Sequence, residues 1–187
     1  MKNSFYIIVC ILLVSGCKQK NENPSKITKA DSFSALPFDT VQDGSINIEV
    51  FDFKNFQPFL HKNNDSIYIV NFWATWCKPC IKELPGIEKI QQDYSHKKVK
   101  VILTSLDFPD KIKSQLIPFI KKMNFQSQVL VLDEPDANAW IPKVDTAWSG
   151  AIPATLIYNN QKRIFYNKPL TYEELKKEIE QLTITKN

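Results

Sequence analysis

Runs of apolar residues predict the strands of an α/β domain. Residues Ile67–Trp73 are apolar except for the polar Asn71 and Tyr68, which is typical of a central strand covered on both faces. Residues 100–106 and 129–132 predict two further strands of the same sheet. Residues 46–50 alternate apolar and polar side chains, as expected for a half-buried strand.

Helical segments are expected between these strands. Residues 77–94 form the longest predicted helix, and Pro85 within it should produce a kink. Residues 112–123 have helical periodicity. Residues 53–62 predict a short helix or turn, and residues 134–140 a turn that leads into a short helix. The alternation of strands and helices indicates an α/β fold.

The C-terminal pattern predicts a hairpin followed by a helix. Residues 152–158 and Arg163–Tyr166 are strand-like, and the polar residues 159–162 between them suit a hairpin turn. Thr171 and Glu174 have the spacing of a capping box, which predicts the start of a final helix. With the earlier strands, the hairpin predicts a central mixed sheet flanked by helices.

Composition and charge narrow the class of protein. The chain has 187 residues, 43% hydrophobic and 24% charged, which is typical of one soluble globular domain with short extensions. Its formal net charge of +4 comes almost wholly from lysines, since Arg163 is the only arginine. No basic stretch is interleaved with aromatic residues, so the sequence argues against nucleic-acid binding.

The N-terminus has the order of a secretory signal. Lys2 precedes the apolar residues 5–14, a stretch shorter than the roughly 20 residues needed to span a bilayer. The four residues that end in Cys17, Val-Ser-Gly-Cys, resemble the lipobox of bacterial lipoproteins. This resemblance implies that residues 1–16 are removed as a signal peptide and that the sulfur of Cys17 carries diacylglycerol. The alternative is a plain signal peptide followed by a free Cys17.

The lipobox resemblance sets the expected domain organisation. Residues 17–36 are mainly polar, with Pro24 and few aromatic residues, and would form a flexible tether. Residues 37–187 would form the folded domain. The protein is therefore expected on the extracytoplasmic, periplasmic side as a membrane-anchored lipoprotein.

Cys77 and Cys80 are the candidate reactive residues. Two residues separate them, and they directly follow a predicted strand, a position where two thiols can form and reopen a disulfide. The same spacing could supply half of a zinc site, but His61 and His96 are isolated and complete no second ligand pair. Inert buried thiols are the third alternative.

A family resemblance decides between these alternatives. Residues 71–80 read Asn-Phe-Trp-Ala-Thr-Trp-Cys-Lys-Pro-Cys, Pro85 follows, and residues 151–155 read Ala-Ile-Pro-Ala-Thr. This combination resembles the thioredoxin superfamily. The additional helix and strand before Pro153 are similar to those of the TlpA/ResA-like membrane-anchored thiol:disulfide oxidoreductases. The resemblance implies a thioredoxin-like fold with an inserted helix-strand segment before a cis-proline.

The resemblance also assigns roles to residues of the site. Cys77 would be the exposed nucleophile and Cys80 the more buried resolving thiol, together forming a redox-active disulfide. Pro153 would be the cis-proline facing the dithiol, and the backbone of Ile152 would hydrogen-bond to the substrate polypeptide. Trp76 would border the site as a further substrate-binding residue.

Glu83 is the candidate proton acceptor. It lies one helical turn after Cys80, where ResA-like proteins carry a functional glutamate. The chain has Asn71 where thioredoxins place a buried aspartate, and an amide cannot titrate. The alternative for Glu83 is a solvated acid favoured by the helix dipole.

Aromatic residues near the predicted site have open roles. Trp73 could border the dithiol or belong to the core. Trp140 is expected in the core, whereas Trp148, in the loop before Pro153, is expected to shape a substrate groove.

The expected function is a thiol:disulfide oxidoreductase that acts on extracytoplasmic proteins as a reductase, with apocytochrome c as one possible client. Its expected partners are client disulfides, a membrane thiol:disulfide electron donor and the membrane itself, and no cofactor or metal is expected. The alternatives are a disulfide-forming oxidase, a peroxiredoxin-like peroxidase, and a lipoprotein that only docks a partner or acts as a chaperone.

Overall fold

A computed structural model describes residues 35–184 of the chain. The predicted signal peptide, residues 1–16, and the predicted lipidation site Cys17 lie outside these residues, as does nearly all of the predicted tether. Those assignments remain predictions. Within residues 35–184, no helix combines the length and the apolar character that a membrane span requires.

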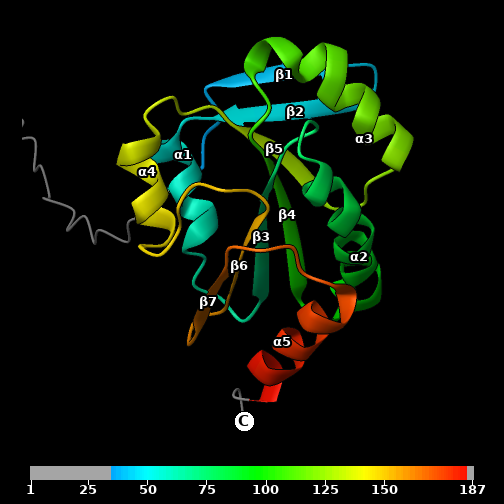
Figure 1. The fold of residues 1–187 in the computed structure, drawn as a ribbon. Helices are drawn as coiled ribbons and strands as arrows, with labels where there is room; N and C mark the ends of the chain where they lie inside the picture. The colour runs from blue at the N-terminus through cyan, green and yellow to red at the C-terminus, as the bar shows by residue number, and fades with distance from the viewer. Residues whose placement is uncertain (1–34, 185–187) are drawn as a thin grey trace, which may run out of the picture. The chain divides into compact units, whose positions relative to one another are not determined.

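The domain is built on one mixed sheet of seven strands (Figure 1). The strand order is β1-β2-β5-β4-β3-β6-β7, in which β2, β5, β4 and β3 are parallel and the remaining pairs antiparallel. The sheet therefore confirms the predicted mixed α/β architecture. The strands are β1 Asp39–Asp43, β2 Ile46–Phe51, β3 Ile67–Trp73, β4 Val99–Ser105, β5 Gln128–Leu132, β6 Ala154–Tyr158 and β7 Arg163–Tyr166.

Helices cover both faces of the sheet. Figure 1 shows α2 and α5 on one side and α1 and α4 on the other. Two clusters of buried apolar side chains correspond to these two faces. The helices are α1 Phe53–Phe56, α2 Lys78–Tyr94, α3 Ile117–Met123, α4 Ala137–Val144 and α5 Tyr172–Ile184.

Strand β3 is buried on both faces, as its apolar sequence predicts. Alternate side chains of a strand point to opposite faces, so Ile69 and Trp73 belong to the cluster under α2, while Val70 and Phe72 belong to the cluster under α1 and α4. Asn71 therefore faces α2. The carboxyl end of β3 leads directly into α2, which places residues 74–77 at the edge where the site forms.

Two segments differ from the sequence prediction. Strand β1 is not recognisable in the sequence, because it is a polar edge strand whose five residues are largely exposed. The single helix expected over 112–123 divides into a π-helical turn, Ile112–Leu116, and α3. Pro118 lies in the first turn of α3, a helix position at which proline is common.

The three tryptophans Trp73, Trp140 and Trp148 are core residues. Trp73 is fully buried and packs against Phe119 at a ring-centroid distance of 5.5 Å. Trp140 is buried as predicted. The expectation of a groove position for Trp148 is wrong, because its ring packs 4.7 Å from that of Phe72 and only 4% of the residue is exposed.

Candidate redox site

The two candidate cysteines form a disulfide at the N-terminus of α2. Cys77 is the N-cap residue of this helix, and the backbone N–H of Cys80 lies 3.3 Å from its Sγ atom. Pro79 occupies the first turn, where a proline is well tolerated. The unpaired N–H groups and positive dipole end of a helix stabilise negative charge. A thiolate on Cys77 would therefore be favoured on reduction.

The disulfide is buried, whereas Trp76, the residue before it, is exposed. Cys80 has no exposed surface and Cys77 is 5% exposed, so Cys77 is the more accessible sulfur but is less open than the expected exposed nucleophile. Trp76 is 58% exposed. Attack on the disulfide from outside is thus confined to the side on which Cys77 lies.

The segment before β6 faces Cys77. The Ile152–Pro153 peptide bond is cis, as the family resemblance implies. The carbonyl oxygen of Ile152 lies 3.7 Å from the Sγ atom of Cys77. This contact brings the predicted substrate-binding backbone next to the predicted nucleophile.

Two features of the preceding loop hold this segment in place. Gly150 has φ +87°, a conformation that side-chain-bearing residues rarely adopt. The indole N–H of Trp148 donates to the carbonyl oxygen of Ala151 at 2.8 Å. Trp148 therefore supports the segment from within the core.

A buried carboxylate anchors the loop that carries Cys77. Both oxygens of Asp107 accept the backbone N–H of Thr75, at 3.0 and 3.2 Å, and one also accepts the Thr75 hydroxyl at 2.5 Å. Ser105 donates a further hydrogen bond of 2.7 Å. Asp107 is 2% exposed. The loop after β4 thus fixes the loop between β3 and α2.

Glu83 lies in a buried polar network between α2 and the sheet. It is 6% exposed, so the interpretation of a solvated acid is wrong. Asn71 donates from Nδ2 to Glu83 at 2.8 Å and to the hydroxyl oxygen of Thr155 at 3.0 Å. Asn71 and Thr155 are paired across β3 and β6. The backbone N–H of Leu170 donates to the second carboxylate oxygen of Glu83 at 2.8 Å.

Burial raises the pKa of Glu83 above its ordinary value, and the hydrogen bonds from Leu170 and Asn71 offset part of this effect. The carboxyl is therefore easier to protonate than an exposed glutamate. Because Glu83 follows Cys80 by three residues on α2, it is available to exchange a proton near the dithiol.

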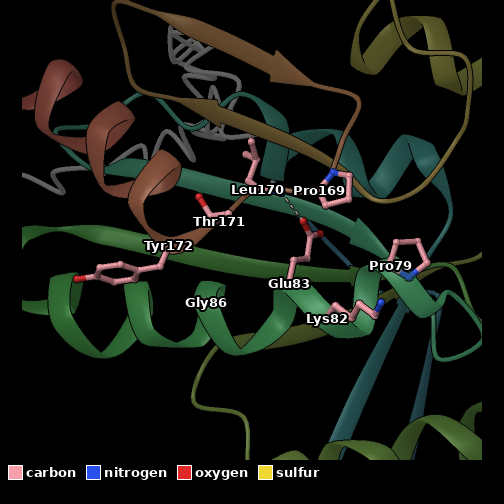
Figure 2. A pocket seen from close by; sticks show the side chains of 8 residues that line it. All are labelled: Pro79, Lys82, Glu83, Gly86, Pro169, Leu170, Thr171 and Tyr172. Atoms are coloured by element: carbon pink, nitrogen blue, oxygen red, sulfur yellow. Dashed lines mark hydrogen bonds between the residues drawn. The ribbon is translucent and has the colours of Figure 1, made fainter.

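A pocket of about 300 Å³ gives solvent a route to Glu83 (Figure 2). In the figure, the Glu83 side chain points towards Leu170, and Lys82 lies towards the start of α2. The N-terminal turn of α5 closes the other end. The lining residues are Pro79, Lys82, Glu83, Gly86, Pro169, Leu170, Thr171 and Tyr172.

The described part of the chain contains no cluster of potential metal ligands. Within residues 35–184, no group of three or more His, Cys, Asp or Glu side chains is arranged to hold a metal ion.

Sequence reasoning missed four partners of the site: Thr75, Asp107, Thr155 and Leu170. Thr75 and Thr155 lie among the residues that carry the family resemblance, but the resemblance assigns them no role. Asp107 and Thr75 each follow a predicted strand, which is a signal for a site at the carboxyl edge of a parallel sheet. Leu170 contributes through its backbone N–H, and its side chain carries no signal of this contact.

Comparison with known proteins identifies the family. Residues 35–167 match the AhpC/TSA family, which is more than half of the chain. The chain belongs to the AhpC/TSA family. The site residues from Asn71 to Pro153 all lie inside the matched segment.

Named relatives of this AhpC/TSA chain include thiol:disulfide proteins. It is 35% identical over 71 residues to the thioredoxin-like protein YneN of Bacillus subtilis, covering 38% of this chain and 41% of YneN. It is 40% identical over 63 residues to the thiol-disulfide oxidoreductase ResA of Bacillus thuringiensis subsp. konkukian, covering 34% and 31%. The matched segments thus span less than half of these two relatives. The resemblance to ResA-like proteins is confirmed.

A longer match joins the chain to a third relative. The thiol:disulfide interchange protein DsbE of Pasteurella multocida is 26% identical over 147 residues, which are 79% of this chain and 71% of DsbE. The similarity therefore extends well beyond the segment around the dithiol.

Solved structures confirm the thioredoxin-like fold. A DsbF homologue from Corynebacterium diphtheriae superposes with a TM-score of 0.53 at 17% identity, covering 81% of this chain and 89% of the other. A secreted thiol-disulfide isomerase from Corynebacterium glutamicum gives a TM-score of 0.52 at 17% identity, covering 73% and 76%. At these identities, the likeness concerns the fold alone.

Proposed function

We propose that this AhpC/TSA-family chain is a thiol:disulfide oxidoreductase that reduces disulfides of extracytoplasmic proteins. The observation that carries the proposal is the Cys77–Cys80 disulfide at the N-terminus of α2, with the Ile152 carbonyl oxygen 3.7 Å from the Cys77 sulfur. The names of the relatives ResA and DsbE support the same chemistry.

The proposed reaction begins with both cysteines reduced. The Cys77 thiolate attacks one sulfur of a client disulfide, forming a mixed disulfide and releasing the other client sulfur as a thiolate. The Cys80 thiolate then attacks the Cys77 sulfur and releases the second client thiol. Two electrons pass to the client, and the Cys77–Cys80 disulfide is the oxidised product. An external dithiol donor returns it to the reduced form.

Glu83 is the proton acceptor in the resolving step. Cys80 must lose its proton to attack, and the buried carboxylate of Glu83 lies one helical turn away on α2. The ionised carboxylate of Glu83 accepts that proton, which then passes to solvent through the pocket that Glu83 lines. Asn71 cannot take this role, because its amide does not titrate, and instead it orients Glu83 through their 2.8 Å hydrogen bond.

The predicted export signal supports an extracytoplasmic site of action, and one structural neighbour is described as secreted. With Cys17 lipidated, the electron donor would be a membrane protein of thiol:disulfide type. Apocytochrome c is a proposed client, by analogy with ResA-like proteins.

A trapping experiment tests the proposal. In a Cys80→Ser variant, the mixed disulfide on Cys77 has no resolving thiol, so covalent client complexes should accumulate in the native envelope and separate on addition of reductant. A Cys77→Ser, Cys80→Ser double variant is the matched control and should trap nothing. A folded Cys80→Ser protein that forms no complex with reducible substrates would oppose the proposal.

The reduction potential tests the direction of electron flow. A value near or below about −250 mV supports a reductase, whereas one near about −120 mV supports a disulfide-forming oxidase. Peroxide consumption without a disulfide substrate would instead favour the peroxidase alternative. Full function in the double variant would favour a docking or chaperone role.

A further inference from the structure

Two strongly exposed aromatic residues lie on loops that meet beside the disulfide. Trp76 precedes Cys77 and is 58% exposed, and Phe108 is 66% exposed. The hydrogen bonds between Thr75 and Asp107 join the two loops, and each aromatic residue directly follows one member of that bonded pair. We refer to Trp76 and Phe108 as the aromatic pair.

The aromatic pair has no partner in the described part of the chain. Neither ring stacks on another ring or carries a cation–π contact within residues 35–184. Only four large apolar side chains in these residues are strongly exposed, and two of them are this pair. Exposed apolar surface concentrated in one place is typical of an interaction site.

Two lysines with unpaired side chains lie in the first turns of α2, directly after Cys77. Lys78 and Lys82 are exposed and, four residues apart on α2, lie on the same side of the helix. Neither side-chain ammonium group has a hydrogen bond or an ion pair within residues 35–184. By contrast, Lys111 near Phe108 is paired with Asp110 at 2.8 Å. The uncompensated surface charge along the start of α2 is therefore positive. We refer to Lys78 and Lys82 as the lysine pair.

The backbone next to Cys77 is available to a bound chain. Ile152 lies before the first residue pair of the β3–β6 ladder, in which Phe72 is opposite Ala154. A client in an extended conformation could lie along Ile152 with its cysteine at Cys77. Its residues beside that cysteine would then lie close to the residues that flank Cys77 in the sequence, Trp76 and Lys78.

We propose that the aromatic pair and the lysine pair select the client segment, which is an extended polypeptide with an apolar residue and a carboxylate beside its reactive cysteine. This inference rests on the proposed function and adds the class of substrate. The aromatic pair buries the apolar side chain, and the lysine pair attracts the carboxylate.

Peptide selectivity tests the inference without an electron donor. The protein is reduced in advance and mixed with short peptides whose single cysteine is joined to glutathione. Attack by Cys77 releases one of the two thiols, and attack by Cys80 then releases the other and leaves the Cys77–Cys80 disulfide. The second-order rate constant of this single turnover is measured for each peptide. The peptides differ only beside the cysteine, with Leu or Ser on one side and Asp or Lys on the other.

The wild-type protein should prefer the Leu peptide over the Ser peptide by about tenfold, which is what partial burial of one apolar side chain provides. Phe108→Ser should reduce this ratio to about twofold or less. Phe38→Ser removes an equally large ring that is 54% exposed outside the site, and it should leave the ratio unchanged. The ratio within each variant cancels changes in thiol reactivity.

The Asp peptide should react about threefold faster than the Lys peptide at low salt, and the difference should disappear at high salt. Lys82→Ala should reduce this preference, whereas Lys177→Ala, on α5, should not. Equal rates for all peptides would overturn the inference while leaving the proposed function intact. A reduced, folded protein that reacts with no peptide would instead contradict the proposed function.

Discussion

Glu83 is subject to two opposing influences. Burial raises its pKa, and the hydrogen bonds from Leu170 and Asn71 lower it by a smaller amount. A thiol proton acceptor functions best when its pKa is close to the working pH, and burial moves Glu83 in that direction. The chain thus provides a titrating group on α2 although its strand position 71 holds an amide.

Replacing Glu83 by Gln should slow the release of a mixed disulfide by about a hundredfold, the scale of general acid–base catalysis. The measurement is single-turnover reduction of a peptide disulfide between pH 5 and pH 9, where the wild-type profile should contain an ionisation that the variant lacks. Glu173→Gln, an exposed substitution in the first turn of α5, is the control and should keep the wild-type profile. An unchanged profile in Glu83→Gln would exclude Glu83 from proton transfer.

The same residue links stability to pH. Because the pKa of Glu83 is higher in the folded protein than its ordinary value of 4.5, the folded state holds the proton more tightly than the unfolded state. This contribution to stability is complete below pH 4.5 and is lost as the pH rises through the raised pKa. Urea unfolding of Glu83→Gln should lack this decline.

At the scale of elements, the start of α5 is joined to the site. The carboxylate of Glu174 accepts the Thr171 N–H at 2.8 Å, and the Thr171 hydroxyl oxygen accepts the Glu174 N–H at 3.2 Å, which confirms the predicted capping box. The residue before this cap is Leu170, whose N–H holds Glu83. The cap therefore orders the loop that orients the buried carboxylate.

Thr171→Ala should lower the free energy of unfolding by about 1 kcal/mol, the usual cost of losing an N-cap side chain. It should also weaken the Leu170 hydrogen bond, so the pKa of Glu83 should rise further. Both effects are measured by urea unfolding across the pH range and by the pH profile of disulfide exchange. Thr171→Ser keeps the hydroxyl and should restore both, and a variant that changes stability without moving the profile would separate the cap from the site.

The sequence predicted most elements and the two cysteines, because both leave local signals. Continuous apolar residues mark β3, and the spacing of Cys77 and Cys80 at the end of that strand marks the dithiol. Strand β1 could not be predicted, since its exposed polar residues are held only by pairing with β2. The anchoring of Thr75 by Asp107 also depends on tertiary structure, because 32 residues separate them.

At the scale of the whole molecule, attachment to a membrane would set which clients the site can reach. The predicted tether of roughly 20 residues would span about 25 Å root-mean-square if it behaves as a coil. Two acyl chains provide stable anchoring, whereas a single chain binds only weakly. The site would then act close to the membrane surface, where a membrane thiol donor is accessible.

The predicted membrane attachment depends on Cys17 and not on Cys10. Both cysteines lie outside residues 35–184. Cys10→Ser should leave attachment unchanged, because the predicted cleavage would remove residues 1–16. Cys17→Ser should abolish the lipid, since serine offers no sulfur for the thioether. Mass spectrometry of the mature N-terminal peptide in each variant measures this directly, with detergent partitioning of the whole protein alongside. An unmodified Cys17 at the mature N-terminus of the wild-type protein would establish a plain signal peptide and place the domain free of the membrane.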